Sequence, residues 1–171
     1  MNPSTHFVML ARYSEWATAR LLDAVALLSE SEYRREAGLF FYSIHGTLNH
    51  LLVGEHHLWF MRFTQGLSPQ VQLDAEVEHD RYVLDAQLRA MNCRWEPWIA
   101  QVPAAKWDGL LHYTTMRGKE VALPFTSTLT HVFNHATHHR GQITAALTAM
   151  GQPCPELDMV YYLQAHQEGV A

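Results

Sequence analysis

The chain has 171 residues, of which 48% are hydrophobic and 17% charged, a composition typical of one globular domain with a full hydrophobic core. Its 12 Lys and Arg against 17 Asp and Glu give a formal net charge of −5, and its longest basic run is only Arg34-Arg35. Phosphate affinity comes mainly from clustered basic side chains, so we expect no nucleic-acid binding. Histidine is the enriched residue type, with 12 copies, which favours a metal site or proton transfer.

The sequence carries no signal typical of secretion or of membrane insertion. The first residues, MNPSTHFVMLARYSEW, lack the basic start and apolar run of a signal peptide. No stretch approaches the roughly eighteen uninterrupted apolar residues of a membrane span. The two cysteines, Cys93 and Cys154, form no Cys-x-x-Cys pair and offer no disulfide framework. We therefore expect a cytoplasmic protein that does not contact a membrane.

Apolar residues that recur at spacings of three and four predict four long helices. These helices are expected at Ser4–Ser29, at Ser43–Thr64, from about Asp74 through Trp98, and at Ser127–Met150. Pro97 should kink the third helix or mark its last turns. Gly66 follows the second helix and Gly151 the fourth, as helix-ending residues do.

Between Trp107 and Pro124 the apolar spacing changes to alternation, with Arg117-Gly118-Lys119 as a turn, so we predict a short β-hairpin. A short final helix is expected at Leu157–Gln167. Four long amphipathic helices favour an all-α four-helix bundle with the hairpin inserted before the last long helix. No repeat or linker divides the chain, so we predict a single domain over residues 1–171.

The segment HVFNHATHHRGQ, residues 131–142, concentrates four histidines on the fourth helix. At about 100° per residue, His139 lies just inside the apolar stripe of this helix and His135 lies at its margin. His131 and His138 fall on the side expected to face solvent. His135 and His139, four residues apart, therefore share one face and could offer two nitrogen ligands to one ion. Two partly buried packing groups remain an equal alternative.

A catalytic zinc site needs a third protein ligand. The second helix supplies four candidates, and helical periodicity does not select among them: His45, His50, His56 and His57. A carboxylate-bridged di-iron site is not expected. The fourth helix has no Asp or Glu between Ser127 and Met150, and the one Glu-x-x-His match is Glu76 to His79. An all-histidine site for one metal ion is what remains.

Three polar residues near these histidines have weaker claims to a role. Glu55 could orient a ligand or act as a base, but an ion pair with Arg62 or Arg140 is the favoured interpretation. Asn134 and Gln142 could support the ligands, and each is more simply read as a helix-surface or packing residue.

Four segments resemble the DinB-like (DinB/YfiT-like) family of helical-bundle metalloproteins. RYSEWATARLLDAVALLSESEY resembles the family's opening, and SIHGTLNHLLVGEHHLWFMRF its second helix. HVFNHATHHRGQI resembles the signature of its last long helix, and PELDMVYYL its tail. The resemblance covers nearly the whole chain, with the segments in the expected order.

The resemblance implies a four-helix bundle that binds one divalent transition metal through His50, His135 and His139. The last two agree with the pair selected by helical angle, whereas His50 rests on the resemblance. Zinc and nickel are the metals it implies first, and three imidazoles also suit iron or copper.

Related branches include thiol-dependent transferases, so the leading expectation is a metal-dependent transferase or hydrolase with an open coordination position. Its partners would be a small electrophilic substrate and a low-molecular-weight thiol. The alternative is a non-catalytic metal-binding protein with a structural or stress-response role, acting as a homodimer.

Overall fold

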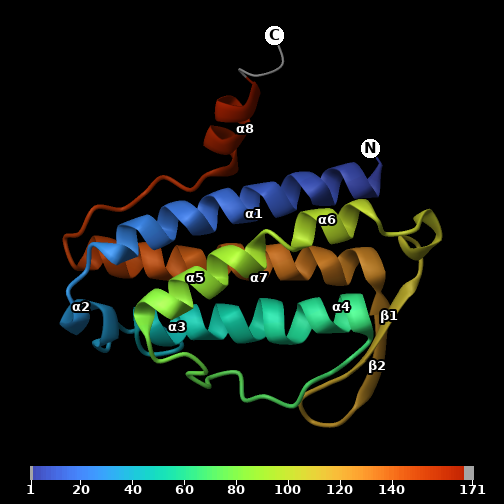
Figure 1. Cartoon of the computed structure of the whole chain (residues 1–171), viewed down its shortest axis with the longest axis horizontal. Helices are drawn as coiled ribbons and strands as arrows, with labels where there is room; N and C mark the ends of the chain where they lie inside the picture. Colours follow the sequence, from blue (N-terminus) through green and yellow to red (C-terminus); the bar gives the residue numbers. More distant parts are fainter. Residues whose placement is uncertain (1, 168–171) are drawn as a thin grey trace.

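The computed structural model describes residues 2–167 and is built mainly of helices (Figure 1). In chain order its elements are α1 (Pro3–Ala26), α2 (Glu30–Arg34), α3 (Ile44–Leu51), the π-helix η1 (Leu52–Phe60), α4 (Met61–Gln65), α5 (Arg81–Asn92), α6 (Trp95–Ala100), the 3₁₀-helix η2 (Ala104–Lys106), β1 (Leu110–Thr114), β2 (Glu120–Pro124), α7 (Phe125–Ala149) and α8 (Met159–Gln167).

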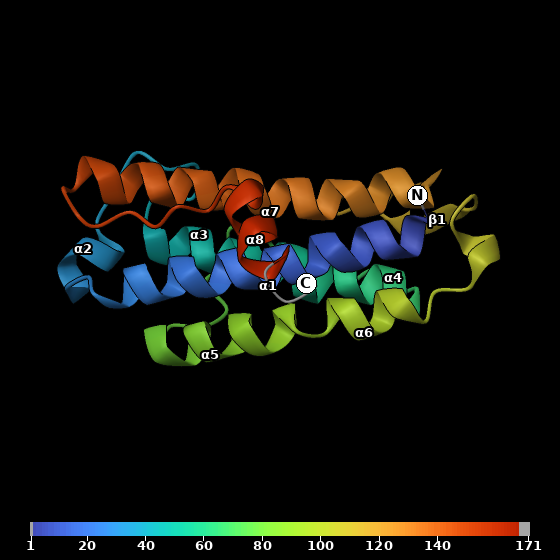
Figure 2. The ribbon, with the colours of Figure 1, turned by 90° about the horizontal axis from the view of Figure 1, so that it is seen from above.

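Four rods form a helical bundle: α1, the continuous helix α3–η1–α4, the broken helix α5–α6, and α7 (Figures 1 and 2). α1 and α7 run in one direction along the bundle, and the other two rods run in the opposite direction. Residues 66–80 make this possible because they return along the outside of the α3–η1–α4 rod before α5 begins (Figure 1). The predicted all-α bundle with a hairpin before the last long helix is confirmed.

Local sequence signals fix most of the helix ends. The Asn2 side chain accepts a hydrogen bond from the Ser4 N–H, and Pro3 occupies the first helical position, where no N–H is needed. Ser43 caps α3 in the same way. Gly66 takes the left-handed conformation that ends α4, and Gly151 takes it after α7.

The third helix begins later than predicted. Residues 74–80 are not helical, and α5 starts at Arg81 because the Asp80 side chain accepts hydrogen bonds from two N–H groups of the first turn. The chain also breaks after Asn92, so Pro97 does not kink a continuous helix. It lies in the first turn of α6, where a missing N–H leaves no hydrogen bond unmade.

Two further features of the helices were not predicted. Ser29 and Glu32 form a reciprocal capping box that starts the short helix α2. The second long helix changes to π geometry over Leu52–Phe60, starting two residues after His50. Such segments shift every following side chain around the helix axis and are frequent at functional sites.

The apolar core has two large clusters, one at each half of the bundle, and a third, small cluster of Tyr13, Ala17 and Tyr162. One large cluster includes Leu21, Leu52 and Ile143, and the other includes Ala11, Phe60 and Phe133. The residues between them on α1, η1 and α7 are buried and polar: Ser14, Thr18, Glu55, His56, His139 and Arg140. We call these six residues the polar layer. The candidate site lies at its edge and shares His139 with it.

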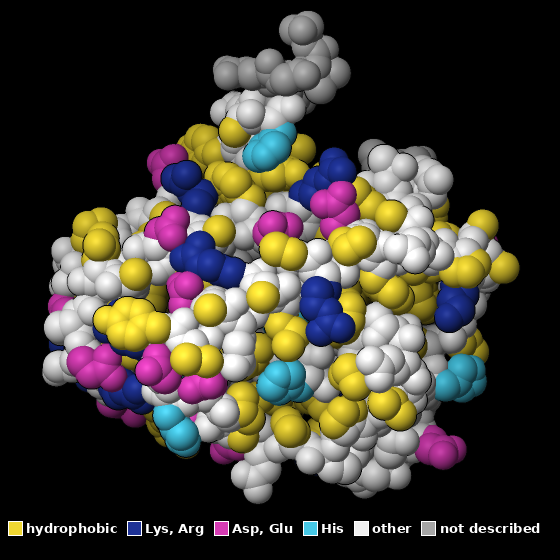
Figure 3. Space-filling view, in the orientation of Figure 1, with side chains coloured by type: hydrophobic (Ala, Val, Ile, Leu, Met, Phe, Trp, Pro, Cys, Tyr) yellow, Lys and Arg dark blue, Asp and Glu magenta, His cyan; other side chains and the backbone are white. Residues whose placement is uncertain are grey.

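Within the described residues, no helix combines the length and the hydropathy that crossing a membrane requires. On the face of the molecule drawn in Figure 3, basic and acidic side chains are interspersed rather than gathered by sign. Cys93 and Cys154 are both exposed and carry free thiols.

Gly46 provides a test of the close approach between α3 and the preceding turn. A Cβ atom at this position would overlap the carbonyl oxygen of Phe41. We predict that Gly46→Ala lowers the free energy of unfolding by about 1–3 kcal/mol, because backbone must move to make room. Urea denaturation monitored by circular dichroism measures the change.

The matched control is Gly141→Ala, also within a helix, where an added Cβ would meet no atom within 4 Å. It should raise the free energy of unfolding by about 0.5–1 kcal/mol, since alanine favours the helical backbone. Equal effects of the two substitutions would contradict the steric argument.

Candidate metal centre

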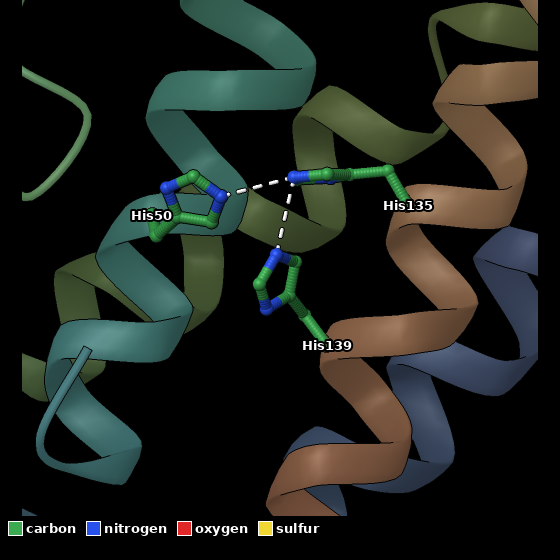
Figure 4. A group of neighbouring side chains, drawn as sticks. All are labelled: His50, His135 and His139. Carbon is green, nitrogen blue, oxygen red and sulfur yellow. Dashed lines mark hydrogen bonds between the residues drawn. The ribbon is translucent and has the colours of Figure 1, made fainter. Parts of the chain in front are cut away.

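The three histidines that the family resemblance implies come together between two rods of the bundle (Figure 4). His50 lies near the end of α3, and His135 and His139 lie one turn apart on α7. The Nε2 atom of His135 is 3.0 Å from Nε2 of His50 and 3.1 Å from Nε2 of His139. Three ring nitrogens therefore point toward a common centre.

Hydrogen bonds at the outer nitrogens determine which ring nitrogen carries the hydrogen in two of the three imidazoles. His50 Nδ1 lies 2.7 Å from the carbonyl oxygen of Leu73, which can only accept, so Nδ1 is the donor. His139 Nδ1 lies 2.8 Å from Oε1 of Gln142, which also accepts. In the neutral rings, the Nε2 atoms of both histidines then present lone pairs to the centre, as metal ligation requires.

His135 is held differently, beside a buried carboxylate. Its Nδ1 atom lies 3.7 Å from Oε1 of Glu55, and neither atom has a hydrogen-bond partner among the described residues. A hydrogen on His135 Nε2 can bridge to His50 or His139, but it cannot serve both lone pairs fully. With a cation at the centre, that hydrogen would move to Nδ1, where Glu55 is the acceptor at hand.

The favoured interpretation of Glu55 as an ion-pair partner of Arg62 or Arg140 is wrong. Arg62 lies between the rings of Trp59 and Tyr113, 4.7 and 4.4 Å from their centroids. The Arg140 guanidinium, also buried, donates to hydroxyl groups of the polar layer and of Thr137. Glu55 thus forms no direct salt bridge with either arginine and faces His135. Burial lowers the pKa of Arg140, and the nearby charge of Glu55 opposes that shift.

Packing fixes the ligands and leaves room beside them. The ring of Phe41 stacks on His50 with centroids 3.7 Å apart. Gly54, one turn after His50, contributes no side chain. A Cβ atom there would lie 3.5 Å from Cε1 of His135 and 3.8 Å from Nε2 of His50, so a larger residue would fill the space next to the ligand nitrogens.

Burial keeps the imidazoles in the form that binds metal. Burial is the largest cause that lowers the pKa of His50 to about 4 and the pKa of His139 to about 4. Both rings are therefore neutral at physiological pH, so no proton has to be displaced from either Nε2 atom. Three converging imidazole nitrogens, with a carboxylate behind one of them, fit one divalent transition metal.

The remaining histidines of the two helices are not part of this group. His45 contacts Tyr33, and His56 is buried toward Arg94 at the break between α5 and α6. His57 is half-buried. His131 and His138 are exposed on α7, as predicted from helical angle.

The two polar candidates on α7 differ in outcome. Asn134 is exposed, in keeping with its interpretation as a surface residue. Gln142 is not a simple surface residue, because its amide joins two histidines: Oε1 faces His139 Nδ1, and Nε2 lies 3.2 Å from His138 Nε2. The i, i+3 spacing to His139 was the sequence signal for this contact.

Gln142→Ala tests the orienting role of that amide. Removing a hydrogen-bond partner of a metal-binding histidine typically costs 10–100-fold in metal affinity. We predict a loss of this size in zinc affinity, measured by competition with a chromophoric chelator. Asn134→Ala, an exposed amide on the same helix, is the control and should bind zinc as the unmodified chain does. Equal zinc affinities of the two variants would show that Gln142 does not contribute to metal binding.

His56 gives a second prediction, on stability. Burial lowers its pKa to about 3 from an ordinary value of 6.5. Between these values the unfolded chain binds a proton that the folded chain does not, so the free energy of unfolding falls as pH drops from 6.5 toward 3. In His56→Leu we expect the loss between pH 6.5 and pH 4.5 to be about 2 kcal/mol smaller. Urea denaturation of metal-free protein measures it.

The control for His56 is His112→Leu, at an exposed position of β1. This substitution should leave the pH dependence of stability as it is. Parallel stability curves for His56→Leu and the unmodified chain would show that the buried ring does not oppose protonation in the fold.

No curated protein and no solved structure matches the chain significantly. The model of one protein family, the DinB family, matches residues 1–170. That match spans the bundle and all three converging histidines, which agrees with the resemblance seen in the sequence. The chain belongs to the DinB family.

Proposed function

We propose that this protein is a metal-dependent enzyme in which His50, His135 and His139 hold one divalent transition metal. The observation that carries the proposal is the convergence of three Nε2 atoms while the outer nitrogens face two acceptors and a carboxylate. Lone pairs at this separation repel one another unless a hydrogen or a cation lies between them. Three protein ligands also match the pattern of catalytic sites, which keep one position open.

Zinc or nickel is the proposed occupant. Imidazole nitrogens suit zinc, nickel, copper and iron, whereas magnesium and calcium prefer oxygen ligands. The converging group offers nitrogen only, since Glu55 faces the outer nitrogen of His135 rather than the centre. When bound, the metal would lower the pKa of a thiol or water molecule that takes the open position.

Two residues of the chain would orient the histidine ligands around the open coordination position. Glu55 would accept the hydrogen of His135 Nδ1 and increase the basicity of the ring. Gln142 would hold His139 and link it to the exposed His138. Glu55 is only 4% exposed, so its carboxylate stays beside His135 and does not turn toward solvent.

A groove beside the centre supports a small organic substrate. It has a volume of about 380 Å³, lies between the hairpin and α7, and is lined mainly by apolar and aromatic groups, among them Trp59, Tyr113 and Leu123. His131 also lines it, and the centroid of the His131 ring is 5.7 Å from that of the ligand His135. An apolar electrophile in this groove would contact His131, which precedes the ligand His135 by one helical turn.

The reaction proposed is transfer of a thiol to such an electrophile. The thiolate sulfur would form a bond to an electrophilic carbon, and the bond from that carbon to its leaving group would break, with the electron pair departing on the leaving group. The thiol proton would pass to solvent. Attack by water on the same kind of substrate is the hydrolytic variant of this chemistry.

We propose a cytoplasmic location, in which the two exposed cysteines would remain reduced. A low-molecular-weight thiol is abundant there and would serve as the second substrate. A non-catalytic homodimer that only binds metal is the competing proposal, and turnover separates the two.

The test is a conjugation assay on the purified chain loaded with zinc or with nickel. The electrophile is a chlorinated bimane, which becomes fluorescent when a sulfur atom displaces chloride. The thiols are cysteine, glutathione, coenzyme A and thiols built on glucosamine. We predict that at least one thiol reacts faster than the uncatalysed rate, and that His139→Ala abolishes the difference because the metal is lost.

His112→Ala is the control, since it removes an exposed histidine of β1 and should keep most of the rate. Parallel assays with activated esters cover hydrolysis. A chain with one bound metal that accelerates neither reaction, with any thiol and either metal, would contradict an enzymatic role and leave the non-catalytic interpretation.

A further inference from the structure

A second group of potential metal ligands lies where α3 meets the segment 66–80. Glu76 and His79, the one Glu-x-x-His match of the sequence, face His45 of α3. Oε2 of Glu76 is 3.5 Å from Nε2 of His45 and 3.9 Å from Nδ1 of His79. All three potential ligand atoms lie within 4.8 Å of one another. Ligand atoms of a tetrahedral zinc ion lie about 3.3 Å apart, so small side-chain movements would close the group on an ion.

We propose that His45, Glu76 and His79 form a second divalent-metal site, separate from the three-histidine centre, with zinc as the fitting ion. Two imidazoles and one carboxylate are a ligand set that zinc uses in proteins. His45 is the buried anchor, at 1% exposure, while Glu76 and His79 reach it from the surface.

The surroundings of His45 leave its Nε2 atom available. Its Nδ1 atom is paired with the hydroxyl of Tyr33 at 3.2 Å. Burial, with help from Arg34, lowers the pKa of His45, so the ring is neutral at physiological pH. The amide nitrogen of Asn49 contacts Nε2, but it also contacts the carbonyl oxygens of His45 and Glu78. Its two hydrogens would therefore stay satisfied if an ion took Nε2.

The carboxylate of Glu76 lacks another positive partner. Among the described residues it forms ion-pair contacts only with His45 and His79, and with no Lys or Arg. The nearby cation Arg34 is paired with Glu30 and with the carbonyl oxygen of His79. A carboxylate that faces a neutral, buried imidazole at 3.5 Å is more stable with a cation between the two groups.

The segment that carries Glu76 and His79 is already tied to α3 by other bonds. Asn49 exchanges two hydrogen bonds with the backbone of Glu78, at 2.9 and 3.0 Å. Earlier in the same segment, the carbonyl oxygen of Leu73 accepts the hydrogen bond from His50 Nδ1. An ion at the second site would therefore hold the segment that orients His50, giving this metal a structural role beside the first.

Zinc stoichiometry tests the proposal independently of any activity. The untagged chain is equilibrated with buffered zinc, separated from free metal and analysed for metal content. We expect two zinc ions in the unmodified chain, one in His79→Ala, one in His139→Ala and none in the combined variant. Glu76→Gln, which keeps the size of the side chain, should weaken binding of the second ion at least tenfold.

Folding is not at risk in His79→Ala, because the side chain of His79 is 82% exposed. Circular dichroism checks this directly. His112→Ala, which removes an exposed histidine from the hairpin, is the control and should keep both ions. Saturation of the unmodified chain at one zinc that His79→Ala still binds would overturn the proposal, as would two zinc ions in His79→Ala or the loss of an ion from the control. A single zinc that is lost in His79→Ala and kept in His139→Ala would instead contradict the three-histidine centre.

Discussion

A buried guanidinium and a buried carboxylate in the middle of the bundle are the constraint on which the rest of the structure depends. Arg140 is 2% exposed and donates to Ser14 and Thr18 of α1, at 2.9 and 3.3 Å, while Glu55 supplies the opposite charge from η1. A buried charge without partners would cost several kcal/mol, so three rods are held in one register around this layer. The apolar clusters on either side then pack on a frame that the polar layer has already defined.

The positions of the three converging histidines depend on the register that the polar layer sets. α7 carries Arg140 and two of the histidines within six residues, so the register that satisfies Arg140 also places His135 and His139. Likewise, η1 carries Glu55 into the polar layer. It begins two residues after His50, so the position of Glu55 also helps to fix that of His50. The remaining positioning comes from outside the rods, through the carbonyl oxygen of Leu73 and the ring of Phe41.

Helical periodicity predicted the features that depend on a single helix. It did not predict contacts between side chains of two different elements. The bundle, the hairpin and the inward position of His139 follow from patterns along single segments, and the structure bears them out. Periodicity could not choose His50 over His45 or His56, because all three are buried and what separates them is the neighbour that each one faces. The family resemblance supplied that choice. The π geometry after His50, and with it the contact of Glu55 with His135, has no periodic signature.

The same frame has a consequence for the thermodynamics of metal binding. In a flexible peptide, ordering three histidines and removing their protons both oppose binding near pH 6. Here folding has already ordered the rings, and burial has already lowered the pKa values of His50 and His139 to about 4. Folding has already supplied the free energy for both. It holds the Nε2 atoms of His50 and His139 at 3.0 and 3.1 Å from that of His135, where one hydrogen cannot serve both lone pairs fully and part of their repulsion remains. A divalent ion would relieve that repulsion, so metal affinity should persist at pH values where a free peptide would have released its ion, and metal binding should stabilise the fold in return.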